Sequence, residues 1–233
     1  MTSEGPNSSL VACAHELKTP LVLVRQLTFE LEKCEDKKRQ TEIIRRIRLT
    51  SERSLRLADN LTKMARLEDA MFELEPIQIN GLCQEVVDEL MPLSQALEQE
   101  LEVSISRKSV VAVAHRELLR SLLMGLLDNA LNYAAGQKIK ISARQIGGST
   151  EITVRDFGSI MDLTQFRKLQ SNLGKHANPI AARPLSSGLG LVIADKFARA
   201  MQGSLTISRH HNGGVSFRAV LPLSQQLSFV EGS

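Results

Sequence analysis

The stretch that most constrains this chain is residues 13–21, which read Cys-Ala-His-Glu-Leu-Lys-Thr-Pro-Leu. If the stretch is helical, a rotation of about 100° per residue places Glu16 and Thr19 on adjacent turns beside His15. Pro20 has no N–H to donate to the carbonyl of Glu16, which predicts a bend just below His15. A titratable ring, a carboxylate and a hydroxyl would therefore share one exposed patch.

The chemistry of this patch centres on the imidazole of His15. Neutral imidazole is a competent nucleophile near its ordinary pKa of about 6.5, and a neighbouring carboxylate can fix its tautomer and take up the ring proton. Glu16 is the candidate for that role. The alternative for a histidine taken alone is an ordinary solvated position on a helix, and the motifs further along the chain decide between the two.

Composition limits the size and the partners of the protein. The 233 residues, 42% hydrophobic and 24% charged, are enough for one ordinary domain and a smaller one. The net charge is only +3, from 29 basic and 26 acidic residues. A balance this close to neutral does not favour nucleic acid or an anionic membrane as a partner.

Neither a membrane span nor a disulfide framework is expected. The most apolar stretch, residues 118–131, is interrupted by Arg120, Ser121 and Asp128, and it falls short of the roughly 20 apolar residues that a span needs. Three scattered cysteines are too few for a disulfide framework and suggest a reducing compartment. We therefore expect a cytoplasmic location, either as a complete protein or as the cytoplasmic portion of a membrane receptor.

The first part of the chain has the period of two helices. Residues 1–9 are polar and are expected to form a flexible lead-in, and dense charge at residues 34–39 predicts a turn. On either side of this turn, apolar or small residues recur at alternating intervals of four and three. These two seams are Leu10, Ala14, Leu17, Leu21, Val24, Thr28 and Leu31, then Ile43, Ile47, Thr50, Ser54, Leu57, Leu61 and Met64. Because two helices alone bury only one face each, the hairpin is expected to dimerise into a four-helix bundle.

After residue 69 the pattern changes to strands mixed with helices. Alternating residues predict strands at 72–79, 101–106, 110–114, 139–143, 152–154, 205–208 and 215–221. Helical patterns predict helices at about 80–97, 115–135 and 190–202, the first of them capped by Asn80. The predicted fold is α+β: an antiparallel helical hairpin followed by an α/β sandwich in which helices cover one face of a mixed sheet.

The segment around His15 resembles the phosphoacceptor box of sensor histidine kinases, His-Glu-Leu-x-Thr-Pro-Leu. The six specified positions match in His15, Glu16, Leu17, Thr19, Pro20 and Leu21. The resemblance implies that His15 takes the γ-phosphoryl group of ATP and passes it to an aspartate on the receiver domain of a response regulator. It also implies Glu16 as the base and Thr19 as the residue that orients water in a reverse phosphatase reaction.

Residues 126–133, Leu-Leu-Asp-Asn-Ala-Leu-Asn-Tyr, resemble the N-box of the same kinases and of the wider GHKL ATPases. The resemblance implies that Asn129 coordinates Mg²⁺ through its amide oxygen and that the ring of Tyr133 lies along the adenine. Gly125 stands where the family often has another asparagine, and Asn132 where a cation usually approaches a phosphate. Loss of that cation would weaken phosphate binding.

Residues 154–160 resemble the G1 box, although the usual second glycine is missing. The resemblance implies that Asp156 accepts a hydrogen bond from the adenine amino group and that Gly158 lets the base approach the backbone. Residues 159–186 are expected to be the ATP lid, a long structureless connection. Three residues of this connection could contact phosphates: Lys175, His176 and Arg183. A solvated basic loop is an equally good explanation for their presence.

Residues 186–191 resemble the G2 box, with a serine in place of its first glycine. Gly188, Leu189 and Gly190 would stand at the start of a helix. There, backbone N–H groups without helical partners and the positive end of the helix dipole receive phosphate oxygens. A single Gly-x-Gly is weak evidence, but these boxes follow one another in the order of the family.

The resemblance covers about residues 10–223 and implies a histidine autokinase that uses ATP and Mg²⁺ and works as a homodimer. It divides the chain into a dimerisation and histidine phosphotransfer domain at 10–69, an ATP-binding domain at 70–223 and a tail at 224–233. Two alternatives remain open. The departures from the boxes are compatible with a degenerate kinase that acts mainly as a regulator phosphatase or scaffold, and the second alternative is a GHKL ATPase without phosphohistidine chemistry.

Overall fold

The computed structural model describes residues 7–67, 72–105, 109–134, 136–171, 173 and 189–223. Within these ranges, the backbone alone is described at residues 7–13, 15, 16, 133, 168 and 171. Two long helices come first, α1 (Asn7–Glu32) and α2 (Lys37–Arg66). The later helices are α3 (Ile79–Ala96), α4 (Arg116–Tyr133), α5 (Leu163–Ser171) and α6 (Leu189–Ala200). The strands are β1 (Glu75–Gln78), β2 (Leu101–Ile105), β3 (Val111–Ala114), β4 (Ile139–Ile146), β5 (Ser149–Asp156), β6 (Ser204–Arg209) and β7 (Val215–Pro222).

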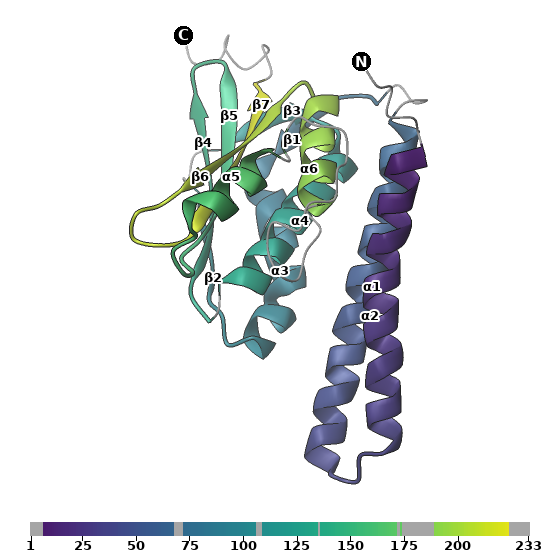
Figure 1. Ribbon diagram of the computed structural model, residues 1–233. Coiled ribbons are helices and arrows are strands. Elements are labelled where there is room, and N and C mark those ends of the chain that lie inside the picture. Colours follow the sequence, from purple (N-terminus) through teal and green to yellow (C-terminus); the bar gives the residue numbers. More distant parts are fainter. Residues whose placement is uncertain are drawn as a thin grey trace.

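The first two helices form the antiparallel hairpin that the two seams predict (Figure 1). The expected turn at 34–39 was too long, because α2 already begins at Lys37. The carboxylate of Asp36 accepts a hydrogen bond from the backbone N–H of Lys38 at 2.8 Å, and this N-cap starts the helix early. Pro20 lies inside α1, which continues as one helix to its end.

The rest of the chain is built around one mixed sheet. Its five strands lie in the order β2-β4-β5-β7-β6; β2 and β4 are parallel, and the other neighbours are antiparallel. Helices α3, α4 and α6 pack against this sheet and cover one face of it (Figure 1). The predicted sandwich is confirmed. Strands β1 and β3 form a separate two-stranded sheet, so each has only one neighbouring strand. Pro76 therefore lies on an edge strand, where a residue without an N–H is tolerated.

The alternation along β5 decides which side chains face the helices. Ile152 and Val154 are buried, and Asp156 follows them on the same face and is itself buried. A strand pattern that places apolar side chains in the core therefore also places this carboxylate between the sheet and its helical cover.

Helix α3 begins one residue before the expected N-cap. Gln78 occupies the cap position and Asn80 lies within the helix, so the predicted cap at Asn80 is wrong. The amide oxygen of Asn80 instead accepts a hydrogen bond from the backbone N–H of Val110 at 3.2 Å. This side chain ties the start of α3 to the residue before β3.

The expectation of a structureless lid at residues 159–186 is wrong for its first half, which contains helix α5. The carboxylate of Asp162 accepts hydrogen bonds from the backbone N–H groups of Thr164 and Gln165, at 2.7 and 2.9 Å, and so caps this helix. Leu169 is buried in the main core and anchors α5 to the domain.

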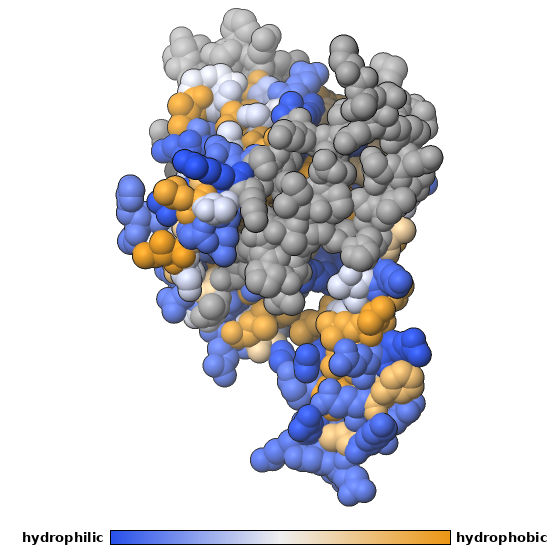
Figure 2. All heavy atoms as spheres, viewed as in Figure 1, coloured by the Kyte–Doolittle hydropathy of each residue, from blue (hydrophilic) through white to orange (hydrophobic). Residues whose placement is uncertain are grey.

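Some apolar side chains of the hairpin are packed against the following domain, and others are exposed to solvent. Along the C-terminal half of α2, the seam residues Leu57, Leu61 and Met64 pack against the core of the following domain. Other large apolar side chains of the hairpin face solvent, and in Figure 2 hydrophobic spheres lie among hydrophilic ones over its lower part. The exposed residues are Leu21, Val22, Leu23, Phe29, Ile44 and Leu55. Within the described ranges, no helix combines the length and the apolar character that crossing a bilayer requires.

Candidate functional site

The end of α4 and the start of α6 approach each other at two of the residues that the boxes single out. The two helices pack together, and a Cβ placed on Gly190 would lie 3.7 Å from Nδ2 of Asn129. That distance is an ordinary van der Waals contact, so the amide of Asn129 lies directly beside the first turn of α6. The first turn of a helix carries backbone N–H groups without helical partners, and these can receive an anion.

This arrangement fits a magnesium nucleotide. The amide oxygen of Asn129 is a hard ligand of the kind that Mg²⁺ prefers, and the helix start at Gly190 offers donors for phosphate oxygens beside it. Leu189 is buried at the base of α6 and fixes this helix start in the core.

The second part of the site is the buried carboxylate of Asp156. The residue is 3% exposed, and its Oδ1 accepts a hydrogen bond from the backbone N–H of Gly158 at 3.2 Å. A carboxylate accepts several hydrogen bonds at once, so Asp156 can also accept one from an amino group such as that of adenine. Strand β5, which ends at Asp156, packs against helix α4, which carries Asn129.

The turn between β6 and β7 closes against the Asp156 loop, whereas the sequence pattern gave these residues only as the connection between the strands predicted at 205–208 and 215–221. Gly214 has a φ of +76°, and a Cβ there would lie 1.9 Å from the carbonyl oxygen of Asp156. A Cβ on Gly213 would lie 2.6 Å from the carbonyl oxygen of Gly158. The two consecutive glycines were the available signal, because a close approach of two backbones needs residues without side chains.

A polar pair stands behind this turn. Nε2 of His210 and Oγ of Ser216 are 2.7 Å apart. Burial lowers the pKa of His210, and the positive charge of Arg155 lowers it further by a smaller amount, so the ring is neutral at neutral pH. The neutral ring and the hydroxyl join the two ends of the β6–β7 turn that carries Gly214.

The phosphoacceptor segment lies in α1. The backbone of His15 and Glu16 is helical, and their side chains lie outside the described part of the structure. Thr19 is exposed on the same helix, one turn after His15. Their roles as nucleophile, base and water-orienting residue remain predictions.

Several other predicted site residues fall where the structure describes little or nothing. Tyr133 ends α4, and its ring lies outside the described atoms. The remaining candidates outside the described residues are Lys175, His176, Arg183 and Gly188.

The part of the chain behind the helical hairpin is thus a mixed sheet covered by helices, with a buried aspartate and an asparagine beside a helix start. Residues 114–225 match the family of histidine kinase-, DNA gyrase B- and HSP90-like ATPases. The chain is 26% identical to the sensor protein kinase PmrB of Pseudomonas aeruginosa over 216 residues, which are 91% of this chain and 44% of PmrB. The chain spans about half the length of the curated relatives it matches.

Solved structures show the same fold. Full-length ShkA in complex with AMPPNP aligns with a TM-score of 0.61 and 18% identity, over 89% of this chain and 46% of ShkA. Histidine kinase ThkA in complex with the response regulator TrrA aligns with a TM-score of 0.62 and 18% identity, over 91% of this chain and 60% of ThkA. Over about nine tenths of its length the chain is therefore similar to sensor histidine kinases, and it has the fold of their catalytic core.

Proposed function

We propose that this chain is the catalytic core of a histidine autokinase that transfers the γ-phosphoryl group of ATP to His15 and then to an aspartate of a response regulator. The observation that carries the proposal is the approach of Asn129 to the helix start at Gly190. It occurs in a domain that also buries Asp156, and this domain follows a helix with the sequence His-Glu-Leu-x-Thr-Pro-Leu.

The nucleotide is proposed to bind through three groups of this chain. Asp156 accepts a hydrogen bond from the adenine amino group, and the open helix start at Gly190 donates to the phosphates. Asn129 would hold Mg²⁺, which neutralises charge on the phosphates when it is bound. The relative ShkA binds AMPPNP, which supports ATP as the nucleotide.

The phosphoryl transfer itself is assigned to α1. A ring nitrogen of His15 forms a bond to the γ-phosphorus as the bond to the bridging oxygen breaks, and ADP leaves. Glu16 holds the tautomer of the ring and takes up its proton. Thr19, exposed one turn further on, orients the water of the reverse phosphatase reaction.

The proposed partners are a second copy of the chain and a receiver domain. The exposed apolar side chains of the hairpin, including Leu21, Ile44 and Leu55, are a surface that a four-helix bundle would cover. The complex of ThkA with TrrA supports a response regulator as the acceptor. The working location proposed for this core is the cytoplasm.

The test is incubation with γ-labelled ATP followed by acid treatment. We expect acid-labile label on the wild-type chain and none on a His15→Gln variant, which should still bind a non-hydrolysable ATP analogue in calorimetry. An Asp156→Asn variant should lose both binding and label. Label that persists in His15→Gln would refute His15 as the acceptor, and wild-type protein that hydrolyses ATP without a phosphoenzyme would refute the autokinase.

A further inference from the structure

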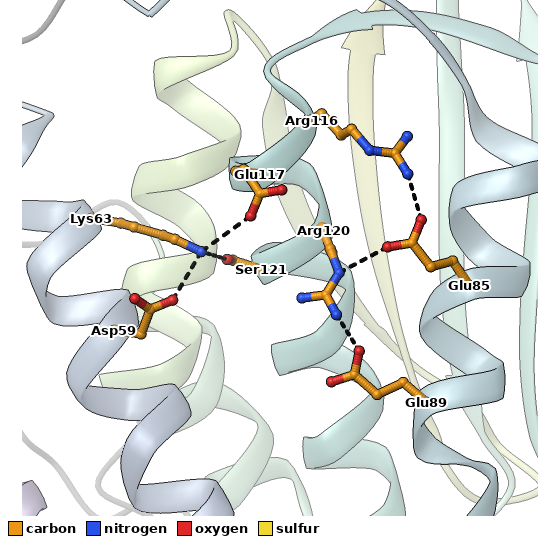
Figure 3. Close-up of polar contacts among 8 residues, drawn as sticks. All are labelled: Asp59, Lys63, Glu85, Glu89, Arg116, Glu117, Arg120 and Ser121. Carbon is orange, nitrogen blue, oxygen red and sulfur yellow. Dashed lines mark hydrogen bonds and ion pairs between the residues drawn. The ribbon is translucent and has the colours of Figure 1, made fainter.

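Helix α2 carries basic side chains that reach across to α4 in the ATP-binding domain. Nε of Arg53 lies 3.2 Å from one carboxylate oxygen of Asp128, and Nη2 of Arg56 lies 3.4 Å from the other. Further along α2, Nζ of Lys63 donates a hydrogen bond to Oγ of Ser121 at 2.9 Å (Figure 3). Long polar side chains thus bridge these two helices.

The spacing of these contacts fixes how α2 and α4 run. Arg56 and Lys63 are two helical turns apart on α2, and their partners Asp128 and Ser121 are two turns apart on α4 in the opposite direction. Seven residues span about 10 Å on each helix. The two helices therefore run antiparallel with matched steps.

The register of the hairpin can be obtained in the same way. Near the turn, Arg39 pairs with Glu30 at 2.7 Å. Both helices rise by about 1.5 Å per residue, so residues equally far from this pair lie at the same height along the hairpin axis. His15 is fifteen residues before Glu30 and Ser54 is fifteen after Arg39, which places the two at the same height. Arg53 and Arg56 flank Ser54, so Asp128 contacts α2 at the height of His15 on the hairpin.

Asp128 is also joined to the nucleotide site by the backbone. It directly precedes Asn129, and its carbonyl oxygen accepts a hydrogen bond from Nδ2 of Asn132 at 2.6 Å. Its side chain is only 13% exposed, and both carboxylate oxygens engage a guanidinium group. Because the two guanidinium groups come from neighbouring turns of α2 and contact different oxygens, together they restrict where this carboxylate can lie.

We infer that Arg53 and Arg56 are positioning residues for phosphoryl transfer: they hold Asp128 so that the nucleotide site beside it stands level with His15. The inference rests on the proposed autokinase function. Phosphoryl transfer depends on alignment more than on covalent chemistry, and a misplacement of about 1 Å can cost about 100-fold in rate. Helix α6, which begins at the nucleotide site, contacts both helices of the hairpin and agrees with this placement.

The experiment compares an Arg53→Gln/Arg56→Gln variant with the wild-type chain. We expect the rate of label transfer from saturating ATP to fall about 10-fold or more, while the affinity for a non-hydrolysable analogue stays within about twofold, because the nucleotide ligands are unchanged. Adding Asp128→Asn to the double variant should cause no further loss, since the arginines act through that carboxylate. Small-angle scattering should show a larger radius of gyration for the double variant.

The matched control is Arg48→Gln. Arg48 lies on the same helix, is 68% exposed and pairs with Glu52 of its own helix at 3.9 Å, so both rate and scattering should stay as in the wild type. A rate that is unchanged or raised in the double variant would overturn the inference, as would a parallel loss of analogue affinity or an equal loss in Arg48→Gln. If the wild-type chain carries no label at all, the proposed function fails, and the scattering comparison alone then decides whether the arginines hold the two domains together.

Discussion

The hairpin and the ATP-binding domain solve the problem of burying apolar surface in opposite ways. The ATP-binding domain encloses a continuous core between sheet and helices, with residues such as Leu122 and Phe197 fully buried. The hairpin leaves Leu55 70% and Leu21 60% exposed. A two-helix unit has no second layer of its own, so it depends on neighbouring surfaces for stability. The difference suggests that one domain is stable through its own packing and the other through what docks on it.

The largest expected effect comes from emptying the core of the ATP-binding domain. Phe197→Ala should lower the free energy of unfolding by about 3–5 kcal/mol, because a buried aromatic side chain leaves a cavity. Leu55→Ala on the hairpin should change it by less than about 0.5 kcal/mol in dilute protein, measured by denaturant unfolding. A cost at Leu55 that grows with protein concentration would show that a second chain covers it, whereas equal costs at low concentration would contradict the comparison.

The next effect, on nucleotide affinity, distinguishes a glycine at the candidate site, Gly214, from a glycine in a remote turn, Gly147. Gly214→Ala should weaken binding of an ATP analogue by about tenfold or more, because the new Cβ would displace the backbone of Asp156 and with it the hydrogen bond proposed between Asp156 and the base. Gly147→Ala is the control: its φ of +56° is strained for alanine, but its Cβ would meet open space. It should cost about 1–2 kcal/mol of stability and leave affinity unchanged in calorimetry. Equal affinities for the two variants would remove the β6–β7 turn from the site.

The smallest effect concerns the thiols of the two domains. Burial raises the pKa of the Cys83 thiol to about 12, so at pH 8 about one in 10,000 molecules carries the reactive thiolate. Cys34, in the hairpin turn, is only half-buried. Iodoacetamide at pH 8 should therefore modify Cys34 in the native protein and reach Cys83 only after denaturation, as peptide mass mapping would show. Prompt modification of Cys83 would mean that the ATP-binding domain opens readily.

Local patterns predicted much of this fold. The steps of four and three gave the hairpin, and the alternating residues gave β4, β5 and β7, because burial on one face repeats with the period of the element. The capping choices were harder. Asn80 and Asp36 are both good N-cap residues, but the amide of Asn80 is used by Val110, far along the chain, and only Asp36 caps a helix. A competing long-range partner cannot be seen in a local pattern.

The site divides in the same manner. Asn129, Asp156 and Gly190 could be singled out because each lies in a short motif. Two contacts could not be predicted in this way: the close approach of Gly214 to Asp156, and the ion pair between Arg53 of α2 and Asp128. Both depend on how elements far apart in the sequence meet. Helix α5 was missed because its nine residues are short for a periodic signal and lie in a stretch expected to be a loop.

The order of strands in the sheet has a consequence for synthesis of the protein. Strand β7, among the last described residues, pairs with β5 in the middle of the sheet, and the turn that leads into it presses on Asp156. While a ribosome still holds residues 215–222, β5 lacks one of its neighbours, and Asp156 lacks the turn that closes against it. A nascent chain should therefore gain the ability to capture nucleotide only after residues 215–222 have left the ribosome.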